Sequence, residues 1–206
     1  PTFMGSELTY IEEGPNAGIR TFVEEGEKGL ALYRSLDEQQ KSLATLLEEK
    51  IYAYSRTEGF RDNEVLPYVG VPVKGFSDQQ RALFLDLVEE YIGTMKADRA
   101  KVRMDEIVAQ LDYTWFAWVG GSGEKDVFYY RIHSPVVLIE YDHHPPVFVV
   151  KEGESNDEPV NWHVHTVVRT PNGNDYGKDL LRQHLEEHHQ DGQTHEGHSH
   201  GDHSHD

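Results

Sequence analysis

The sequence predicts an α+β protein in which N-terminal helices pack on an antiparallel β-meander, followed by a C-terminal helix and a disordered His-rich tail. Apolar residues recur with the 3.6-residue period of helices as far as Leu111 and with the 2-residue period of strands after it. The expected strands are joined by short connections, which favour antiparallel neighbours. Because the helices precede the strands and do not alternate with them, the fold class is α+β.

The chain is expected to begin irregularly and then to become helical. Residues 1–34 have weak periodicity, with a short helix expected near Phe22–Tyr33. Ser35, followed three residues later by Glu38, has the pattern of a capping box, which predicts the start of a helix that runs to Tyr54. Leucines at helical spacing would form the apolar face of this helix.

A connector and two further helices complete the helical part. Gly and Pro residues in the segment 55–75 predict the connector. Ser77 and Gln80 form a second capping-box pattern, and the apolar stripe after it ends near Ile92. A third helix is expected over 97–110.

Alternating apolar and polar residues predict five strands and a final helix. The strands are expected at Tyr113–Val119, Val127–His133, Val136–Asp142, Val147–Lys151 and Trp162–Val168. Glycines within 120–123 can adopt positive φ, which predicts a hairpin turn between the first two strands. An amphipathic helix is expected over 177–190. The expected organisation is a mainly helical part (1–112) and a sheet with the last helix (113–190), in one domain, then a tail (191–206).

Composition excludes several classes of function. The chain has 206 residues, 19 of them basic and 37 acidic, and a formal net charge of −18. Nucleic-acid binding is therefore not expected, because phosphate contacts need clustered Lys and Arg. No apolar run approaches the ~20 residues of a membrane-spanning helix. With no cysteine, the chain has no disulfide, thiolate metal site or cysteine nucleophile.

Histidine is concentrated towards the C-terminus. None of the 13 histidines precedes His133, and seven lie within the last 19 residues. The tail histidines expected to bind metal are His195, His198, His200, His203 and His205. Histidine alternating with Gly, Ser and Asp is typical of a flexible ligand with several donor groups. The alternative is an inert or pH-responsive tail, since imidazole takes up a proton near pH 6.

A pair of histidines in the last expected strand predicts a metal site. His163 and His165 point to the same face of a strand, because residues two apart share a face. Glu140 and Asp142 also share one parity, together with His144. If the two faces meet, two imidazoles and a carboxylate would suit Zn, Fe, Mn, Ni or Cu. The alternative is two surface histidines on an exposed sheet face.

A third ligand could come from the last expected helix. His184 lies there among leucines, so it is either a core residue or a third imidazole that reaches the sheet. No nucleophile elbow, phosphate loop or dinucleotide fingerprint is present, which leaves metal chemistry as the strongest indication of function.

Several blocks of the sequence resemble the bacterial domain-of-unknown-function 3500 family. The blocks are Phe116–Trp118, Tyr129–Ile132, Leu138–Asp142, His163–His165 and Asp175–Leu181, followed by His184. The resemblance covers roughly residues 1–185 and excludes the tail. Two features depart from the family pattern, namely a longer segment between the third and fifth strands and the residues that follow His165.

The resemblance carries implications beyond the fold. It implies that Glu140, Asp142, His163, His165, Asp175 and His184 act as a group. Members are longer and have a further N-terminal half, so this chain resembles the C-terminal part of such a protein. The missing half would then be a separate chain, or the protein a homo-oligomer. Many members look exported, which implies a periplasmic or extracellular location.

Three functions are consistent with these observations. The first is an exported metal-dependent enzyme, hydrolytic or oxidative, that uses Zn, Cu, Fe or Ni with a His/His/carboxylate or three-His site. The second is a non-enzymatic protein that buffers or delivers metal through its tail. The third is a structural subunit of a larger assembly, joined to its partner through an unpaired sheet edge.

Overall fold

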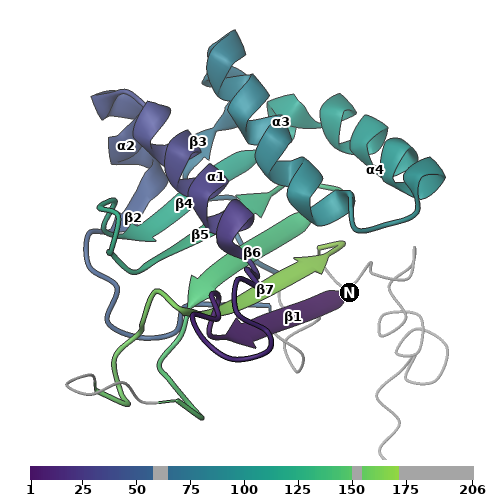
Figure 1. Cartoon of the computed structure of the whole chain (residues 1–206). Helices are drawn as coiled ribbons and strands as arrows, with labels where there is room; N and C mark the ends of the chain where they lie inside the picture. The colour runs from purple at the N-terminus through teal and green to yellow at the C-terminus, as the bar shows by residue number, and fades with distance from the viewer. Residues whose placement is uncertain (58–64, 150–154, 172–206) are drawn as a thin grey trace, which may run out of the picture.

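The computed structural model describes residues 1–57, 65–149 and 155–171 of the chain (Figure 1). The α-helices are α1 (Val23–Ser35), α2 (Glu38–Ala44), α3 (Asp78–Ile92) and α4 (Ala97–Ala109). The strands are β1 (Thr2–Glu7), β2 (Thr45–Leu47), β3 (Val71–Pro72), β4 (Trp115–Gly120), β5 (Phe128–His133), β6 (Leu138–His143) and β7 (His163–Arg169). Short 3-10 turns at Val73–Gly75 and Leu111–Tyr113 precede α3 and β4. The α+β prediction is confirmed.

One sheet organises the described part of the chain. Its strand order is β1-β7-β6-β5-β4-β2, with β3 also paired to β4. The strands from β4 to β7 form the predicted antiparallel meander, and β1 adds to its far edge against β7. The β2–β4 pair is parallel, which a purely antiparallel prediction did not include. Joining of another chain to a sheet edge stays a prediction.

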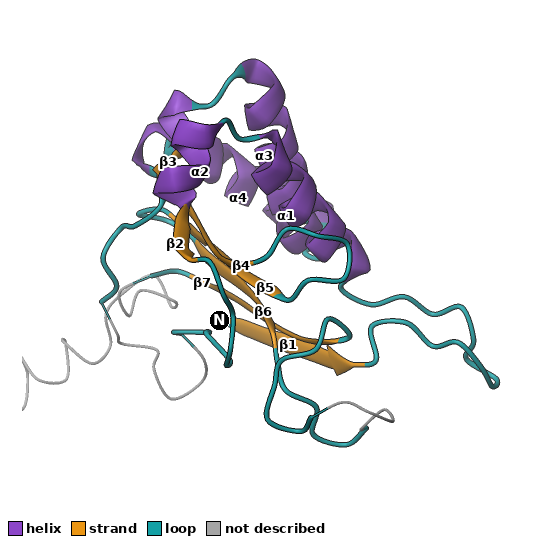
Figure 2. Ribbon diagram, turned by 90° about the vertical axis from the view of Figure 1, so that its left-hand side faces the viewer, coloured by secondary structure: helices purple, strands orange, loops and turns teal. Residues whose placement is uncertain are grey.

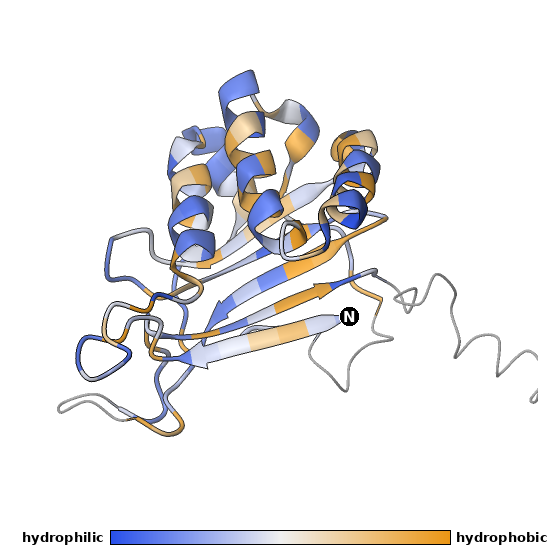
Figure 3. Cartoon of the chain, turned by 45° about the vertical axis from the view of Figure 1, so that its right-hand side comes forward, coloured by the Kyte–Doolittle hydropathy of each residue, from blue (hydrophilic) through white to orange (hydrophobic). Residues whose placement is uncertain are grey.

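The helices cover one face of the sheet and leave the other face to loops. Figures 1 and 2 show α1, α2, α3 and α4 stacked on the same side of the strands. Alternating hydrophilic and hydrophobic bands along α1 and α3 in Figure 3 match helices that bury one stripe only. Aromatic rings fill the sheet side of this layer, where Trp118 stacks on Tyr33 at 4.4 Å and on Phe128 at 4.6 Å.

Local capping signals set the starts of α2 and α3. Ser77 and Gln80 form the predicted capping box at α3. The first box is displaced, because Asp37 and not Ser35 caps α2, with Gln40 as its partner. Ser35 instead ends α1, and its hydroxyl donates to the Leu32 carbonyl.

The predicted long helix over 35–54 is wrong beyond Ala44. The chain leaves the helix at Thr45, which is extended, and β2 then pairs in parallel with β4. Leu43 and Leu47, which were expected on an apolar helix face, are about half exposed. A pairing with a strand some 70 residues later thus overrides the local helical pattern.

Two other predictions are wrong for the same kind of reason. Residues 1–34 contain β1, which forms only because β7 lies beside it. No strand occupies the described part of Val147–Lys151, where Phe148 is 88% exposed. The backbone N–H groups of residues 147–149 donate instead to the Glu7 carboxylate.

The predicted hairpin turn is confirmed at Gly120. This residue has φ 99, and an added Cβ would lie 2.4 Å from the Val127 carbonyl oxygen, so only glycine fits there. In the ranges that the structure describes, no helix has the length and apolar character needed to cross a membrane. The expected helix over 177–190 and the tail lie outside the described residues.

Candidate functional site

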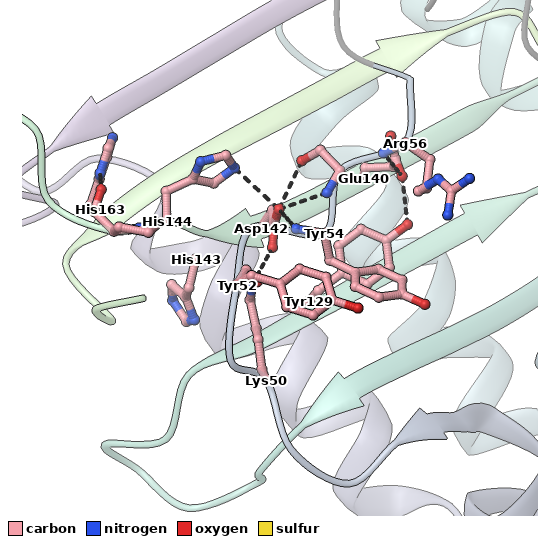
Figure 4. Close-up of polar contacts among 12 residues, drawn as sticks. Lys50, Tyr52, Tyr54, Arg56, Tyr129, Glu140, Asp142, His143, His144 and His163 are labelled. Atoms are coloured by element: carbon pink, nitrogen blue, oxygen red, sulfur yellow. Dashed lines mark hydrogen bonds and ion pairs between the residues drawn. The ribbon is translucent and has the colours of Figure 1, made fainter. Parts of the chain in front are cut away.

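The loop-covered face of the sheet carries a buried polar layer. Strand alternation directs Tyr129, Arg131, Glu140, Asp142 and His165 to this face, opposite the apolar core. Both carboxylates have 0% exposure. The segment that follows β2 crosses this face and donates hydrogen bonds to it, so the layer lies between the sheet and a loop (Figure 4).

Glu140 binds this crossing loop with both carboxylate oxygens. It accepts hydrogen bonds from the backbone N–H groups of Arg56 and Thr57, at 2.9 Å each, and from the Thr57 hydroxyl at 2.6 Å. The Tyr129 hydroxyl donates to its other side at 2.5 Å. Burial, and then the Glu140 charge, raise the pKa of Tyr129 well above its ordinary value, so the phenol stays a donor. Glu140 therefore anchors the loop to β6.

Asp142 binds the same loop and a buried cation. The backbone N–H groups of Tyr54 and Ser55 donate to Oδ2 at 2.5 and 2.7 Å, and the Lys50 ammonium lies 2.7 Å from Oδ1. Burial opposes ionisation of Asp142, but His144 and Lys50 outweigh it and hold the pKa of the carboxyl at about 2. Burial lowers the pKa of Lys50, and Asp142 opposes that shift. The Asp142 carboxylate is therefore ionised at neutral pH.

Three imidazoles gather beside Asp142, where β6 ends and β7 begins. The ring centroids of His144 and His165 are 3.8 Å apart, those of His163 and His165 4.9 Å, and those of His144 and His163 5.8 Å. Nε2 of His144 lies 3.1 Å from Oδ2 of Asp142. His165 is directly opposite Asp142 in the β6–β7 register. We call His144, His163 and His165 the histidine cluster.

Neighbouring groups set the chemical state of the cluster. The Pro145 carbonyl accepts a hydrogen bond from Nδ1 of His163 at 2.6 Å, which leaves Nε2 as the basic nitrogen of the neutral ring. Burial, followed by His144 and His163, lowers the pKa of His165 to about 4, although the Asp142 charge opposes the shift. His165 is therefore neutral at pH 7 and has a lone pair that a metal could use.

The neighbouring strand β1 leaves room for the cluster. Gly5 pairs with His165, and an added Cβ there would lie 2.8 Å from Cδ2 of the ring. Phe3, two residues earlier, meets the same ring edge-on at 5.3 Å. A side chain at Gly5 would displace the imidazole, so β1 shapes this end of the site.

The cluster has the residue types of a transition-metal site, but its rings are not spaced to hold an ion as they stand. Three imidazoles bound to one tetrahedral ion at about 2.0–2.1 Å would place their ring centres roughly 5 Å apart. The observed separations lie on both sides of that value. As the side chains stand, the described part of the chain contains no group of three His, Asp or Glu residues that could hold an ion. Binding would require the rings of His144 and His165 to turn apart.

The structure brings some of the predicted ligands together. His163, His165 and Asp142 meet on one face, as the strand parity predicted. Glu140 shares that face, but its oxygens hold the crossing loop. His184, Asp175 and the tail histidines His195, His198, His200, His203 and His205 lie outside the described residues. Their role as ligands stays a prediction.

Two residues of the site were missed by sequence reasoning, and a third was undervalued. Lys50 has no motif around it and reaches Asp142 across 92 positions of the chain, whereas Tyr129 lies in a family-like block that gave it no role. His144 shares the parity of Asp142 in the sequence, which could have placed it in the ligand set. His143 points away from the Asp142 carboxylate in Figure 4, and its Nδ1 accepts from the Phe128 N–H on the helix-covered face.

Comparisons with known proteins identify the family of the chain. The model of the family described as "Protein of unknown function (DUF3500)" matches residues 1–178, which leaves only the C-terminal part with the tail outside the match. Neither the curated proteins nor the solved structures include a match. A family match over this share of the chain confirms the resemblance seen in its sequence blocks. The chain belongs to the DUF3500 family, whose function is unknown.

Proposed function

We propose that the protein binds one divalent transition-metal ion through His144, His163 and His165. The observation that supports this is the gathering of three imidazoles with ring centroids 3.8–5.8 Å apart, beside a buried carboxylate. Imidazole donors without thiolate suit Zn, Cu, Fe or Ni. The proposal uses the predicted His163 and His165 and takes His144, in place of Glu140, as the third ligand.

Neighbouring residues would hold the ligands in place for such an ion. The Pro145 carbonyl orients His163, and Asp142 contacts His144, as outer-shell partners commonly do for metal-binding histidines. Lys50 keeps Asp142 ionised in the buried layer.

We further propose that this site makes the protein a metal-dependent enzyme, hydrolytic or oxidative. Three protein ligands are typical of catalytic sites, which keep a position open for substrate, whereas structural sites are closed by four. The ion would supply Lewis-acid polarisation of a substrate oxygen. An exported location, periplasmic or extracellular, is part of the proposal and is supported by the family resemblance alone.

The second candidate is a protein that buffers or delivers metal through the tail. The density of histidine after residue 187 favours it, because such sequences bind metal with fast exchange. The two candidates differ in where the tightly bound ion sits. A full chain with the tail histidines replaced by Gln separates them without removing any segment.

Isothermal titration of Zn²⁺ into three full-length variants tests the proposal. The tail-substituted chain should retain one saturable site. The same chain with His163→Gln and His165→Gln should lose it, whereas His133→Gln, which removes another buried histidine on the same sheet face, should keep it. If the tail-substituted chain binds no ion, the cluster is not a metal site and the tail candidate remains.

A further inference from the structure

A cleft of about 180 Å³ lies on the helix-covered face of the sheet, whereas the histidine cluster lies on the other face. The start of α1 forms one wall, and β5 and β6 form the floor with Phe128, Tyr141 and His143. Figure 1 shows α1 passing above these strands. The hairpin between β4 and β5 contributes Glu124 and Asp126 to the rim. A cavity of ~150 Å³ accommodates benzene, so the cleft has room for an aromatic ring and a short chain.

The cleft changes from apolar and buried at its floor to polar and exposed at its rim. Phe128 and Tyr141 are 5% and 3% exposed, and their rings stack at a centroid distance of 5.5 Å. Leu30 of α1 adds an apolar side chain to the facing wall. Glu124 and Asp126 are exposed. This gradient fits a ligand that has an apolar body and a polar outer end.

A hydrogen-bond donor at the floor of the cleft is nearly unused. Nδ1 of His143 accepts from the Phe128 N–H at 2.9 Å, so the neutral ring has its proton on Nε2. Among the described residues, the only hydrogen-bonding contact of Nε2 is the Tyr141 hydroxyl at 3.5 Å, which is long for a hydrogen bond. Because His143 is 2% exposed, a weakly paired N–H is costly there, and an acceptor atom on a ligand would satisfy it.

The rim carries an excess of negative charge. Glu124 forms no hydrogen bond or ion pair with the described residues. Oδ2 of Asp126 accepts from a backbone N–H of its own hairpin turn, and the carboxylate keeps its charge. Glu27 is already paired with Arg20, and the Lys125 side chain does not line the cleft. Acidic residues in the first turn of α1 offset the positive end of that helix. The rim therefore attracts a cation and repels an anion.

We propose that this cleft binds a small organic amine whose apolar body ends in a hydrogen-bond acceptor. The acceptor takes the His143 Nε2–H, and the body packs against Phe128 and Tyr141. The ammonium lies at the rim beside Glu124 and Asp126. A phenolic amine combines these three parts in a molecule of suitable size. The site requires no metal ion and is separate from the histidine cluster.

Differential scanning calorimetry of the full-length protein with four matched compounds tests each part of the ligand. Tyramine has all three parts, phenethylamine lacks the phenolic oxygen, para-ethylphenol lacks the ammonium, and para-hydroxyphenylacetate replaces it by a carboxylate. The titrations are made at pH 7 and constant ionic strength with a chelator present, so the proposed metal ion has no influence. We expect tyramine to raise Tm saturably. Phenethylamine should bind roughly fivefold and para-ethylphenol roughly threefold more weakly, and the carboxylate should have no effect.

Substitutions place the ligand in the cleft. Glu124→Gln should weaken tyramine binding roughly threefold and leave para-ethylphenol binding unchanged. The matched control Glu38→Gln, whose side chain is 95% exposed on α2, should change neither. His143→Asn keeps an acceptor for the Phe128 N–H but lacks the Nε2–H, so it should weaken the binding of tyramine and not that of phenethylamine.

A cleft-filling variant keeps the test decisive if His143→Asn does not fold. Leu30→Trp enlarges a partly exposed wall residue and should abolish the response to every compound. No saturable response to tyramine in the parent protein would overturn the proposal. So would equal responses to tyramine and the carboxylate, or a tyramine response that survives Leu30→Trp unchanged.

Discussion

The two faces of the sheet are buried by different means. The helix-covered face packs aromatic and aliphatic side chains, such as Trp118 and Phe84, against one another. The loop-covered face buries carboxylates, cations and imidazoles, and it is closed by backbone N–H groups that reach Glu140 and Asp142. The same strands supply both layers, because alternate residues point to opposite sides.

This difference assigns most of the stability to one face of the sheet and the proposed function to the other. Apolar burial is non-directional and stabilises the fold roughly in proportion to area. A buried polar layer gives little net stability, since desolvation offsets its hydrogen bonds, yet it fixes each donor and acceptor in place. The proposed metal site, the histidine cluster, lies in the polar layer. The comparison would fail if substitutions on the two faces changed the free energy of unfolding in the same way.

The largest expected effect is on the helix-covered face. Trp118→Ala removes a fully buried indole that stacks on Tyr33 and Phe128, and it should lower the free energy of unfolding by about 3–5 kcal/mol. Urea denaturation measures the loss. Leu47→Ala, at a half-exposed position, is the control and should change stability by less than about 1 kcal/mol. Similar losses for both variants would argue against a packed core on this face.

A polar-face substitution should be rescued by a second one, which sharpens the contrast. Asp142→Asn leaves the Lys50 charge buried without its partner and should cost about 3 kcal/mol of unfolding free energy. Adding Lys50→Met removes that charge and should recover part of the loss. Urea denaturation of the parent, the two single variants and the double variant gives the coupling between them. Additive losses would show that the ion pair contributes nothing.

A fall in pH should lower the free energy of unfolding, because neutral histidines buried on both faces take up protons when the chain unfolds. Burial lowers the pKa of His143, on the helix-covered face, to about 3 and that of His133 to about 4. Both folded-state values lie below the ordinary value near 6.5, so the unfolded chain binds more protons. Stability is therefore complete above about pH 6.5 and is lost as the pH falls towards 3–4, by at most about 1.4 kcal/mol per pH unit for each histidine.

Unfolding free energies measured between pH 7 and pH 4 check the histidine effect. His133→Gln should show a shallower decline over this range than the parent protein. The His143 ring should remain neutral, because its Nδ1 must accept the Phe128 N–H. Identical pH profiles for the parent and His133→Gln would show that His133 titrates normally in the folded state.

The smallest expected effect concerns the space beside the histidine cluster. Gly5→Ala places a methyl group against the His165 ring and should cost about 1 kcal/mol, because side chains must shift to admit it. It should also weaken Zn²⁺ binding to the tail-substituted chain. Gly75→Ala is the matched control, since an added Cβ there has no atom within 4 Å. Equal Zn²⁺ affinity in both variants would show that β1 does not influence metal binding.

Local chemistry made much of the fold predictable. The Ser77 capping box, the two-residue period of the meander and the turn at Gly120 all depend on residues close together in the sequence. The elements that were missed depend on distant pairing. Strand β1 forms against β7 and β2 forms against β4, and no local pattern encodes either partner.

The site likewise has a part that the sequence predicted and a part that it did not. The two-residue spacing predicted that His163 and His165 share a face, and strand parity placed Asp142 where it could meet them. Nothing in the sequence indicated that a loop would bind Glu140 through its backbone or that Lys50 would reach Asp142. Backbone donors carry no residue-type signal, so this layer could be recognised only in three dimensions.

Metal content is the most direct test of the central claim, that the histidine cluster holds an ion. The full-length protein with the tail histidines replaced by Gln is purified without added metal and analysed for elements, next to the same chain with His144, His163 and His165 replaced by Gln. We expect close to one transition-metal ion per chain in the first protein and almost none in the second. Equal metal content in the two proteins, or none in the first, would contradict the claim.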